Sequence, residues 1–261
     1  MKSRGGGNNM NNITYYMEKT LEYYSKWLGE DGILSQNFNG IKYVYYKERN
    51  EIQYGHGQPF DIYIFVMGNK VIVSYGDKAK SKIEIFRDSI GDFKSIDDLK
   101  SYLKKIYGKV IGHNIKYVFN GKKTNINKSK VLDKNDYKEY ESFFRKCNPK
   151  CSNIEWLQVY FEEMICENLC VGAYEDGKLV SCTDVPGVPY MSDEVHEIGI
   201  NTLSDYRGKG YATTACQGRI NELIKNGKVP QWSTSITNLP SQRLAEKLGF
   251  VKIADVITLT L

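Results

Sequence analysis

The stretch Arg207-Gly208-Lys209-Gly210-Tyr211-Ala212 decides the fold of this 261-residue chain. It follows an apolar run at residues 195–202, which predicts a strand, and it opens an amphipathic segment that predicts a helix ending near Asn226. A glycine-rich turn that enters a helix leaves several backbone N–H groups without partners in the chain. Because these donors lie at the positive end of the helix dipole, they favour a phosphate group. We therefore expect the C-terminal half of the chain to hold a phosphorylated ligand.

The spacing excludes two other phosphate-binding patterns. A Walker loop needs Gly-Lys-Ser/Thr after four intervening residues, whereas Lys209 lies between the two glycines and Tyr211 follows them. A dinucleotide-binding fingerprint needs Gly or Ala three residues after the second glycine, and this residue is Thr213. It also needs an acidic residue near the end of the next strand, and residues 231–237 contain none. A Gly-x-Gly turn alone is also compatible with a helix that merely needs flexible residues at its start.

The residues after this helix predict further alternation of strands and helices. Gly227 and Pro230 are typical of a helix end, and a short strand is predicted over residues 231–237. Residues 238–249 predict a short helix with Asn at its cap, Pro in its first turn and Gly as its stop. An apolar strand is predicted over residues 251–259.

In combination, these elements resemble the GNAT superfamily of acyl-CoA-dependent N-acetyltransferases. The resemblance follows the order strand, Arg-Gly-x-Gly-x-Ala, helix, strand, Asn-x-x-Ser, helix and Leu-Gly-Phe. The matching residues are Glu197-Ile198-Gly199-Ile200, Tyr206 to Ala212, Asn238, Ser241 and Lys247 to Phe250. The strong motifs cover residues 195–250, and a weaker match in element order reaches back to Val131. The pair Pro230-x-Trp232 and residues 244–249 are most similar to a bacterial branch with a long N-terminal extension.

The resemblance implies an α+β fold, in which a mixed, twisted central sheet is flanked by helices. We assign this GNAT acetyltransferase domain to residues 131–261, and a smaller α+β domain of unknown role to residues 13–125. Residues 1–12 are rich in Gly and Asn and are expected to form a disordered leader. Before the loop at residues 185–194, the chain predicts two helices and then two strands, over residues 133–146, 153–168, 169–174 and 178–183.

The N-terminal region carries no chemical motif. A helix is predicted over residues 15–28, and Ser95 predicts the cap of another helix that ends near Tyr107. Strands are predicted over residues 41–46, 62–66, 71–75, 82–86 and 115–119. His56 lies between two glycines and is interpreted as a loop residue. This region could shape the acceptor site, form the surface of a homodimer, or only support the fold.

The composition agrees with a soluble enzyme. No apolar run reaches the length of a membrane span and no signal peptide is visible, so we expect a cytoplasmic protein that does not act at a membrane. The net charge of +5 is mild; it could attract anionic CoA, and it does not indicate nucleic-acid binding. The six cysteines are scattered, which fits a reducing compartment. The spacings Cys147-x3-Cys151 and Cys166-x3-Cys170 differ from the common zinc spacing, so we expect no metal site.

The resemblance implies acetyl-CoA, and coenzyme A as its product, as the cofactor. It also implies that backbone N–H groups at residues 198–200 face the thioester carbonyl, where a strand bulge leaves a gap for the pantetheine arm. Asn238 and Ser241 are expected to hydrogen-bond that arm, to cap their helix, or both. The full set of expected cofactor contacts is Ile198, Gly199, Ile200, Asn201, Thr202, Arg207, Gly208, Lys209, Gly210, Tyr211, Ala212, Asn238 and Ser241.

Glu197 is the candidate catalytic base. In an extended strand, Glu197 and Gly199 face one way, while His196 and the two isoleucines face the other. The isoleucines are expected to pack on a helix, so Glu197 points to the opposite face, two residues before a glycine that leaves room for a ligand. A bridging water is plausible because a carboxylate with a pKa near ~4.3 is a poor base for an amine near ~10.4. The alternative is an ordinary carboxylate at the end of a strand.

This chain departs from the family at the residue that usually acts as the catalytic acid. Many members carry a tyrosine after the Leu of the Asn-x-x-Ser helix, and here that residue is Ala245. Ser241, Tyr190 and Tyr211 are candidate replacements, and Ser241 is the one we include among the catalytic residues. A thiol with a pKa near ~8.5 also leaves fairly well as a thiolate, so the missing tyrosine need not abolish activity.

These patterns predict an enzyme that moves an acetyl group from acetyl-CoA to a primary amine by direct attack in a ternary complex. A small-molecule acceptor is favoured because no protein-docking module is apparent. Two alternatives stay open at this point: a non-catalytic CoA-binding sensor or regulator, and a protein N-acetyltransferase.

Overall fold

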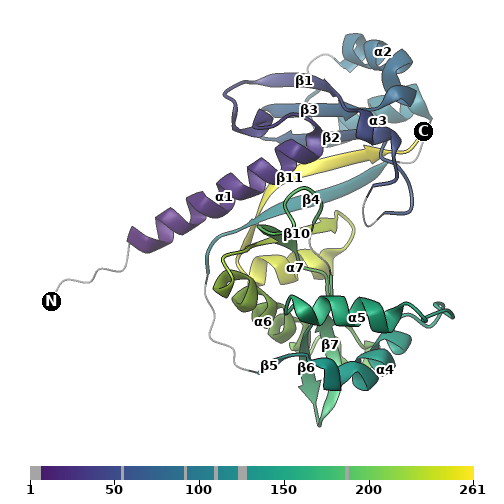
Figure 1. Ribbon diagram of the computed structural model, residues 1–261. Coiled ribbons are helices and arrows are strands. Elements are labelled where there is room, and N and C mark those ends of the chain that lie inside the picture. The colour runs from purple at the N-terminus through teal and green to yellow at the C-terminus, as the bar shows by residue number, and fades with distance from the viewer. Residues whose placement is uncertain (1–6, 54–55, 91–92, 109–110, 123–127, 186–187) are drawn as a thin grey trace. The chain divides into compact units, whose positions relative to one another are not determined.

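The computed structural model describes residues 7–53, 56–90, 93–108, 111–122, 128–185 and 188–261 (Figure 1). The chain groups into two compact units, and each unit is built from separated segments. The first unit comprises residues 1–16, 119–232 and 243–251; the second comprises residues 17–118, 233–242 and 252–261. Each predicted domain, residues 13–125 and residues 131–261, is one consecutive segment of the chain, unlike these two units. The domain boundaries therefore stay a prediction.

The first unit contains the glycine-rich turn and the elements around it. Its elements are β5 (Ser129–Val131), α4 (Tyr137–Cys147), α5 (Leu157–Cys166), β6 (Val171–Glu175), β7 (Lys178–Thr183), β8 (Val195–Glu197), β9 (Asn201–Thr202) and α6 (Tyr211–Lys225). Four strands form an antiparallel ladder in the order β5-β6-β7-β9. β8 instead pairs in parallel with the start of β10 (Val229–Ser235). α6 packs against β5, β6 and β7, which places the start of this helix beside the ladder.

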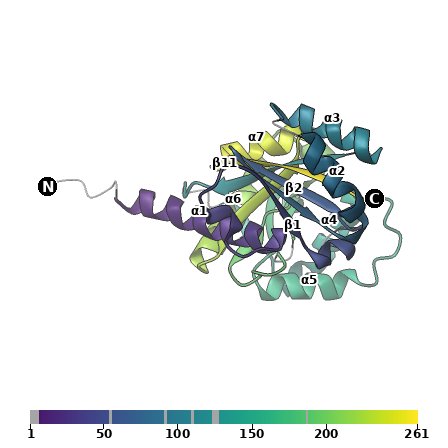
Figure 2. The ribbon, with the colours of Figure 1, turned by 90° about the horizontal axis from the view of Figure 1, so that it is seen from above.

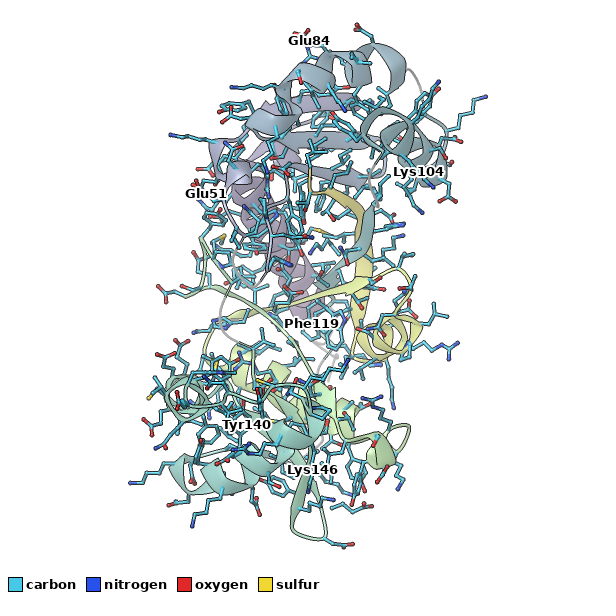
Figure 3. All side chains as sticks on the ribbon, turned by 90° about the vertical axis from the view of Figure 1, so that its right-hand side faces the viewer. Glu51, Glu84, Lys104, Phe119, Tyr140 and Lys146 are labelled. Atoms are coloured by element: carbon cyan, nitrogen blue, oxygen red, sulfur yellow. The ribbon has the colours of Figure 1, made fainter. Side chains whose placement is uncertain are left out.

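A hydrophobic core joins α4, α5 and β7 within this unit. Tyr140, labelled in Figure 3, stacks on Phe161 of α5 with their ring centroids 4.7 Å apart. Leu157 and Cys182 belong to the same buried cluster. Asp133 caps the turn that precedes α4 with a capping box, which explains why the chain starts a helix there. The buried residues of α4 (Tyr140 and Phe143) and of α5 (Leu157, Phe161 and Met164) follow the helical period.

The second unit contains most of α1 (Gly7–Leu28) and a sheet covered by two helices. Its further elements are β1 (Gly40–Tyr45), β2 (Ile62–Met67), β3 (Lys70–Tyr75), α2 (Lys80–Ile90), α3 (Ile96–Tyr107), β4 (Gly112–Phe119), α7 (Leu239–Lys247) and β11 (Phe250–Leu259), several of which extend beyond the unit. The strand order here is β1-β3-β2-β11-β4-β10. Figure 2 shows α2 and α3 side by side, and both contribute to one core with β2 and β3. α1 begins at Gly7, inside the stretch assigned to a disordered leader, and residues 1–6 lie outside the described residues.

The strand predicted over residues 82–86 is wrong, because this segment lies within helix α2. Ile83, Phe86 and Ile90 are buried, and their spacing of three and four residues is that of one helical face. Ile85 is 55% exposed, which is incompatible with the core position that a strand would give to both isoleucines. Five alternating residues resemble a strand locally, but the longer buried period decides in favour of the helix.

The helices in the described part of the chain include none with both the length and the apolar character needed to cross a bilayer.

Candidate functional site

The predicted strand over residues 195–202 is divided into two short strands with different partners. β8 pairs in parallel with β10, with Gln231 opposite Glu197, whereas β9 pairs antiparallel with β7. Residues 198–200 lie between the two strands, and the Ile198 N–H donates to the Gln231 carbonyl over 2.9 Å. The chain thus leaves one ladder and joins another within three residues. This break lies where the resemblance implied a strand bulge.

β9 is the last strand of its ladder, so one of its edges carries backbone groups that face away from β7. The Leu203 N–H donates to the Val180 carbonyl over 3.0 Å, and the register pairs Asn201 with Cys182. Antiparallel hydrogen bonding alternates along a strand, so the N–H groups of Ile200 and Thr202 point to the free edge. Such an edge can pair with an extended molecule that contains amide groups. The pantetheine arm of coenzyme A has this chemistry.

Gly199 does not leave room for a ligand at its Cα, contrary to the expectation from the sequence. A Cβ placed on Gly199 would lie 2.0 Å from Cγ2 of Val185. Glycine is required here because the segment after β7 passes in direct contact with it. The Ile198 N–H already donates to the Gln231 carbonyl, so the N–H groups of residues 199 and 200 stay candidate contacts to the thioester. The Gly199 Cα faces Val185.

The turn before α6 presents backbone donors. Gly208 and Gly210 have φ values of +75° and +94°, which glycine adopts without strain. Gly210 is the N-cap of α6, and no side chain caps this helix. The first helical bond runs from Thr214 N to Gly210 O over 3.1 Å, so the N–H groups of residues 211–213 precede the helical ladder. This arrangement fits the pyrophosphate group that the sequence predicted.

Lysine and arginine side chains surround the same turn. The Nζ atoms of Lys178 and Lys209 lie 4.8 and 5.2 Å from the centre of the Tyr206 ring, and Lys178 donates to the Tyr206 hydroxyl over 3.2 Å. Arg207 Nε donates to the Thr202 carbonyl over 3.2 Å. Lys178 was not among the predicted cofactor contacts, because only the β6–β7 hairpin brings it next to residues 206–209. Its position makes it an additional candidate contact to a CoA phosphate.

His196 lies on the side of the β8–β10 pair that faces α6, which is the side opposite to the one predicted for Glu197. The His196 Nδ1 lies 3.4 Å from Nη2 of Arg219, which is on α6. Glu197, the next residue along the strand, therefore points away from α6. It is half-buried at the end of β8, immediately before the break. Glu197 therefore stays the candidate base. His196 packs against α6.

Burial lowers the pKa of His196 to about 4, and the positive charges of Lys228 and Arg219 act in the same direction. An unfolded histidine has a pKa near ~6.5, so the unfolded chain binds this proton first when the pH falls. Stability is therefore lost progressively from about pH 6.5 to about pH 4, by about 2–3 kcal/mol from this residue alone. Urea unfolding at a series of pH values should show that His196→Gln removes this part of the slope. The variant His113→Gln should retain it; equal slopes in the wild type and His196→Gln would contradict the assignment.

The candidates for a catalytic acid have different surroundings in the structure. The Tyr211 hydroxyl donates a hydrogen bond to the Glu175 carboxylate, and this bond raises the pKa of Tyr211 to about 12. Tyr211 is therefore a poor proton donor in this arrangement. Tyr190 is 44% exposed and has a left-handed φ of +67°, a conformation that is rare for tyrosine. Ala245, at the position of the usual tyrosine, is fully buried.

Nothing in the sequence singled out Asp184, a carboxylate that is only 8% exposed. Its Oδ2 accepts a hydrogen bond from the Tyr140 hydroxyl over 2.7 Å, and its carbonyl accepts one from Tyr160. Burial raises the pKa of Asp184. It directly precedes Val185, which contacts Gly199, so Asp184 lies beside the break between β8 and β9. Its two tyrosine partners tie α4 and α5 to the end of β7.

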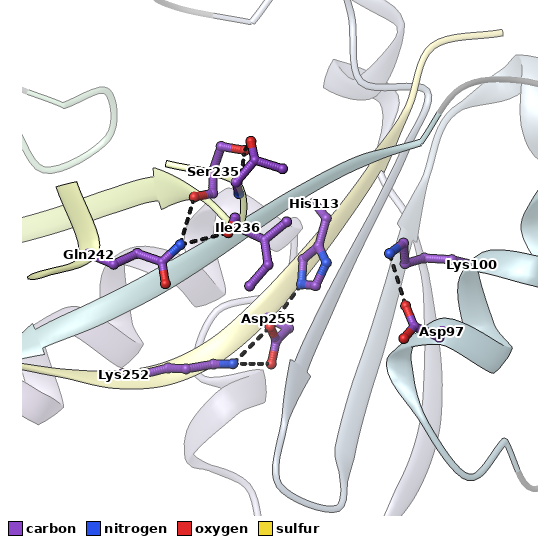
Figure 4. A network of polar contacts seen from close by, with 9 residues as sticks. Asp97, Lys100, His113, Ser235, Ile236, Gln242, Lys252 and Asp255 are labelled. Atoms are coloured by element: carbon purple, nitrogen blue, oxygen red, sulfur yellow. Dashed lines mark hydrogen bonds and ion pairs between the residues drawn. The ribbon is translucent and has the colours of Figure 1, made fainter. Parts of the chain in front are cut away.

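Asn238 and Ser241 belong to the second unit and are described there. Asn238 Oδ1 accepts a hydrogen bond from Ser241 N over 3.2 Å, so Asn238 caps α7 as one of the two predicted roles requires. Gln242 donates to the carbonyls of Ser235 and Ile236, over 3.2 and 2.7 Å, and fixes the segment before α7 (Figure 4). The contact of Asn238 and Ser241 with the pantetheine arm stays a prediction.

In the part of the chain that the structure describes, no group of three or more His, Cys, Asp or Glu side chains is placed to hold a metal ion. All six cysteines carry free thiols. Cys170, Cys182 and Cys216 are buried, where thiols pack as small apolar groups.

A protein-family model described as GNAT acetyltransferase matches residues 98–258. Over 74 residues the chain is 35% identical to a protein of Bacillus subtilis strain 168 named uncharacterized N-acetyltransferase YdfB. The aligned part is 28% of this chain and 27% of that relative, so the similarity spans about a quarter of the relative's length.

Solved structures of two acetyltransferases are among those similar to this chain. A GNAT-family acetyltransferase from Colwellia psychrerythraea is 16% identical, with a TM-score of 0.49 over 60% of each chain. A GCN5-related N-acetyltransferase-like protein from Streptococcus suis 89/1591 is also 16% identical, with a TM-score of 0.45 over 97% of this chain and 99% of that chain. These similarities are too distant to indicate an acceptor.

Proposed function

From the premise that the chain belongs to the GNAT acetyltransferase family, we propose that it transfers an acetyl group from acetyl-CoA to a primary amine of a small molecule. The transfer takes place by direct attack in a ternary complex. The observation that carries this proposal is the separation of β8 from β9 at residues 198–200, which precedes β9 and the uncapped start of α6 along the chain. One continuous segment thus presents a candidate base, a free strand edge and a cluster of phosphate-binding donors.

Acetyl-CoA is the acetyl donor used by this family, and the residues of the first unit fit it. The N–H groups of residues 211–213 and the side chains of Arg207 and Lys209 hold the pyrophosphate. The free edge of β9, with the N–H groups of Ile200 and Thr202, binds the amides of the pantetheine arm. Of the predicted donors at residues 198–200, the Ile198 N–H already donates to the Gln231 carbonyl. The Gly199 N–H is therefore the one that stabilises the thioester oxygen as it gains negative charge. Asn238 and Ser241 are further proposed contacts to the arm.

Glu197 removes the proton that would keep the acceptor from reacting. Acetyl-CoA, when bound, supplies an activated acetyl thioester. The Glu197 carboxylate accepts a proton from the acceptor's ammonium group, directly or through a water, and so frees the nitrogen lone pair. The nitrogen then bonds to the carbonyl carbon, the C–S bond breaks, and its electron pair leaves with the sulfur. The second proton of the nitrogen passes to the departing thiolate or to solvent, which gives the neutral amide and coenzyme A. Because a thiol has a pKa near ~8.5, the thiolate can leave without a protein acid, which fits the hydrogen bond that already engages Tyr211.

The surroundings of Glu197 favour a slender acceptor. Glu197 is half-buried. The Val185 side chain packs directly against Gly199, two residues after Glu197. The acceptor must therefore present its amine on a narrow end, as an amino sugar, a polyamine or an amino-containing antibiotic does. A lysine side chain or a chain N-terminus is the alternative, which would make the protein a protein N-acetyltransferase.

A non-catalytic CoA-binding sensor is the second candidate function. It is favoured by one specific observation: Ala245 is fully buried at the position where the family usually carries its tyrosine. Such a protein would bind acetyl-CoA without releasing thiol in the presence of any amine.

One experiment separates these functions. The purified full chain is incubated with acetyl-CoA and a panel of amino sugars, polyamines, amino-containing antibiotics and lysine-containing peptides, and free thiol is measured. We expect thiol release with at least one small amine, with intersecting initial-rate plots that indicate a ternary complex. Release with peptides alone would establish a protein acceptor. Binding of acetyl-CoA without thiol release for any amine would establish the sensor.

A further inference from the structure

Gln231 on β10 is completely buried, yet its side chain has no hydrogen bond. Its exposed fraction is 0%, and neither Nε2 nor Oε1 has a partner among the described residues. A buried polar group without a partner costs about 1–3 kcal/mol, and an apolar side chain of similar size would avoid that cost. The carboxamide is therefore unfavourable for the folded protein alone. This points to a partner that the described part of the chain does not supply.

The position of Gln231 identifies the place where that partner binds. β10 and β8 pair in parallel, with Gln231 in register with Glu197. Side chains at matching positions of paired strands project from the same face, about 4.8 Å apart at the backbone. Because His196 projects toward Arg219 on α6, both Glu197 and Gln231 project from the opposite face of the pair. The buried carboxamide thus adjoins the candidate base, at the point where β8 ends.

The chemistry of a carboxamide restricts the kind of partner. Its oxygen accepts hydrogen bonds and its nitrogen donates them, so it suits a ligand that carries both kinds of group. A primary amine with a neighbouring hydroxyl is such a ligand, since the amine N–H donates and the hydroxyl oxygen accepts. An amide of the pantetheine arm has the same pair of groups, so the experiment must distinguish these two sources.

We propose that Gln231 binds the acceptor, with Oε1 accepting a hydrogen bond from the reacting amine and Nε2 donating to a neighbouring oxygen of the same molecule. This proposal rests on the proposed function, because it needs an amine that loses its proton to Glu197. Gln231 neither gives nor takes a proton. It holds the nitrogen so that the lone pair, once freed, points at the thioester carbon. Its role makes it a determinant of which amines are accepted.

The test replaces Gln231 with methionine, an apolar side chain of similar length. For the amine found in the panel, we expect kcat/KM to fall about 10- to 100-fold, the loss that removal of one or two substrate hydrogen bonds produces. The Kd for acetyl-CoA, measured by calorimetry, should change less than about twofold. The free protein should become more stable, with its Tm raised by a few degrees, because the unsatisfied amide is gone. Gln231→Leu provides a second apolar variant in case methionine packs poorly.

A matched control is Gln217, a buried glutamine of the same unit whose side chain does have a hydrogen-bond partner. Gln217 on α6 is 1% exposed and its Nε2 donates to Asn221 Oδ1 over 3.2 Å. Gln217→Met should therefore lower the Tm and leave the kinetics for the acceptor unchanged.

Three outcomes would overturn the proposal. A tenfold weaker Kd for acetyl-CoA with an unchanged acceptor KM would assign the carboxamide to the pantetheine arm. A lower Tm with unchanged kinetics in both apolar variants would show a structural role. If the wild-type protein released no thiol with any amine, both the proposed function and the role of Gln231 would be excluded. This failure differs from a failure of the Gln231 proposal alone, because it is observed before any substitution is made.

Discussion

Replacing Gly210 with aspartate should abolish the thermal shift that acetyl-CoA gives to the wild-type protein. At a concentration about 100-fold above its Kd, a ligand stabilises the native state by about 2.7 kcal/mol, which raises the Tm of a protein of this size by about 5–10 °C. The introduced carboxylate would place a negative charge at the N-cap of α6, where the pyrophosphate is proposed to bind. The φ of +94° also disfavours any side chain at this residue. Differential scanning fluorimetry with and without acetyl-CoA measures the effect.

Gly227, just beyond the other end of α6, provides a matched control. Its φ is +71°, and a Cβ there, as at Gly210, would meet nothing within 4 Å. Gly227→Asp therefore introduces the same charge and the same kind of backbone strain, away from the glycine-rich turn. It should lower the Tm of the free protein and keep the full shift with acetyl-CoA. If Gly210→Asp also kept the full shift, the turn at residues 207–212 would not be the phosphate site.

Replacing Glu197 with glutamine should lower kcat by about 10²- to 10⁴-fold, the range expected when a general base is removed. Glutamine keeps the size of the side chain and most of its hydrogen-bonding capacity but cannot take up the amine proton. The thermal shift with acetyl-CoA should therefore remain within about 1 °C of the wild-type shift, an expectation that follows because the cofactor donors lie on other residues. Steady-state thiol release with the preferred amine gives kcat.

Glu222→Gln is the control for this prediction, because Glu222 lies on α6 and its carboxylate forms an ion pair with Lys225, over 3.5 Å near the surface. Such pairs contribute little to stability, so both kcat and Tm should stay close to the wild-type values. A kcat within twofold of wild type for Glu197→Gln would exclude Glu197 as the base. Asp184, the buried carboxylate beside the same break, would then be the next residue to test.

Local signals in the sequence predicted much of the fold. Ser95 caps α3, and its hydroxyl oxygen accepts the Asp98 N–H over 3.1 Å, as its side-chain chemistry requires. The hairpin strand β7 was predicted over the residues it occupies, 178–183, because a Gly-containing turn precedes it. The turn before α6 was predicted for the same reason, because the positive φ values of Gly208 and Gly210 depend on the residue type itself. Its contact with a phosphate group stays a prediction. The helix α2 was missed because five residues of alternating polarity do not reveal which face the rest of the chain covers.

The sequence could not predict contacts between segments that lie far apart along the chain. Gly199 was expected to make room for a ligand, but the Val185 side chain meets it instead. Lys178 joins the cations around the turn only through the β6–β7 hairpin, and Tyr140 reaches Asp184 only through the packing of α4 on β7. Each of these depends on which strands pair and in which register. A pattern within one segment carries no such information.

The sequence by itself determined the turn at which we propose that the acetyl donor is held, since a turn with two glycines at the start of a helix leaves its backbone donors unpaired wherever the rest of the chain lies. It also determined the family, because the spacing of short motifs is a property of the chain. Only the tertiary structure decided what surrounds the candidate base. The parallel pairing of β8 and β10 places the buried Gln231 carboxamide beside Glu197, and the segment after β7 closes Gly199. The physical reason is that turn and helix-capping preferences depend on neighbouring residues, whereas burial and strand register depend on the whole fold.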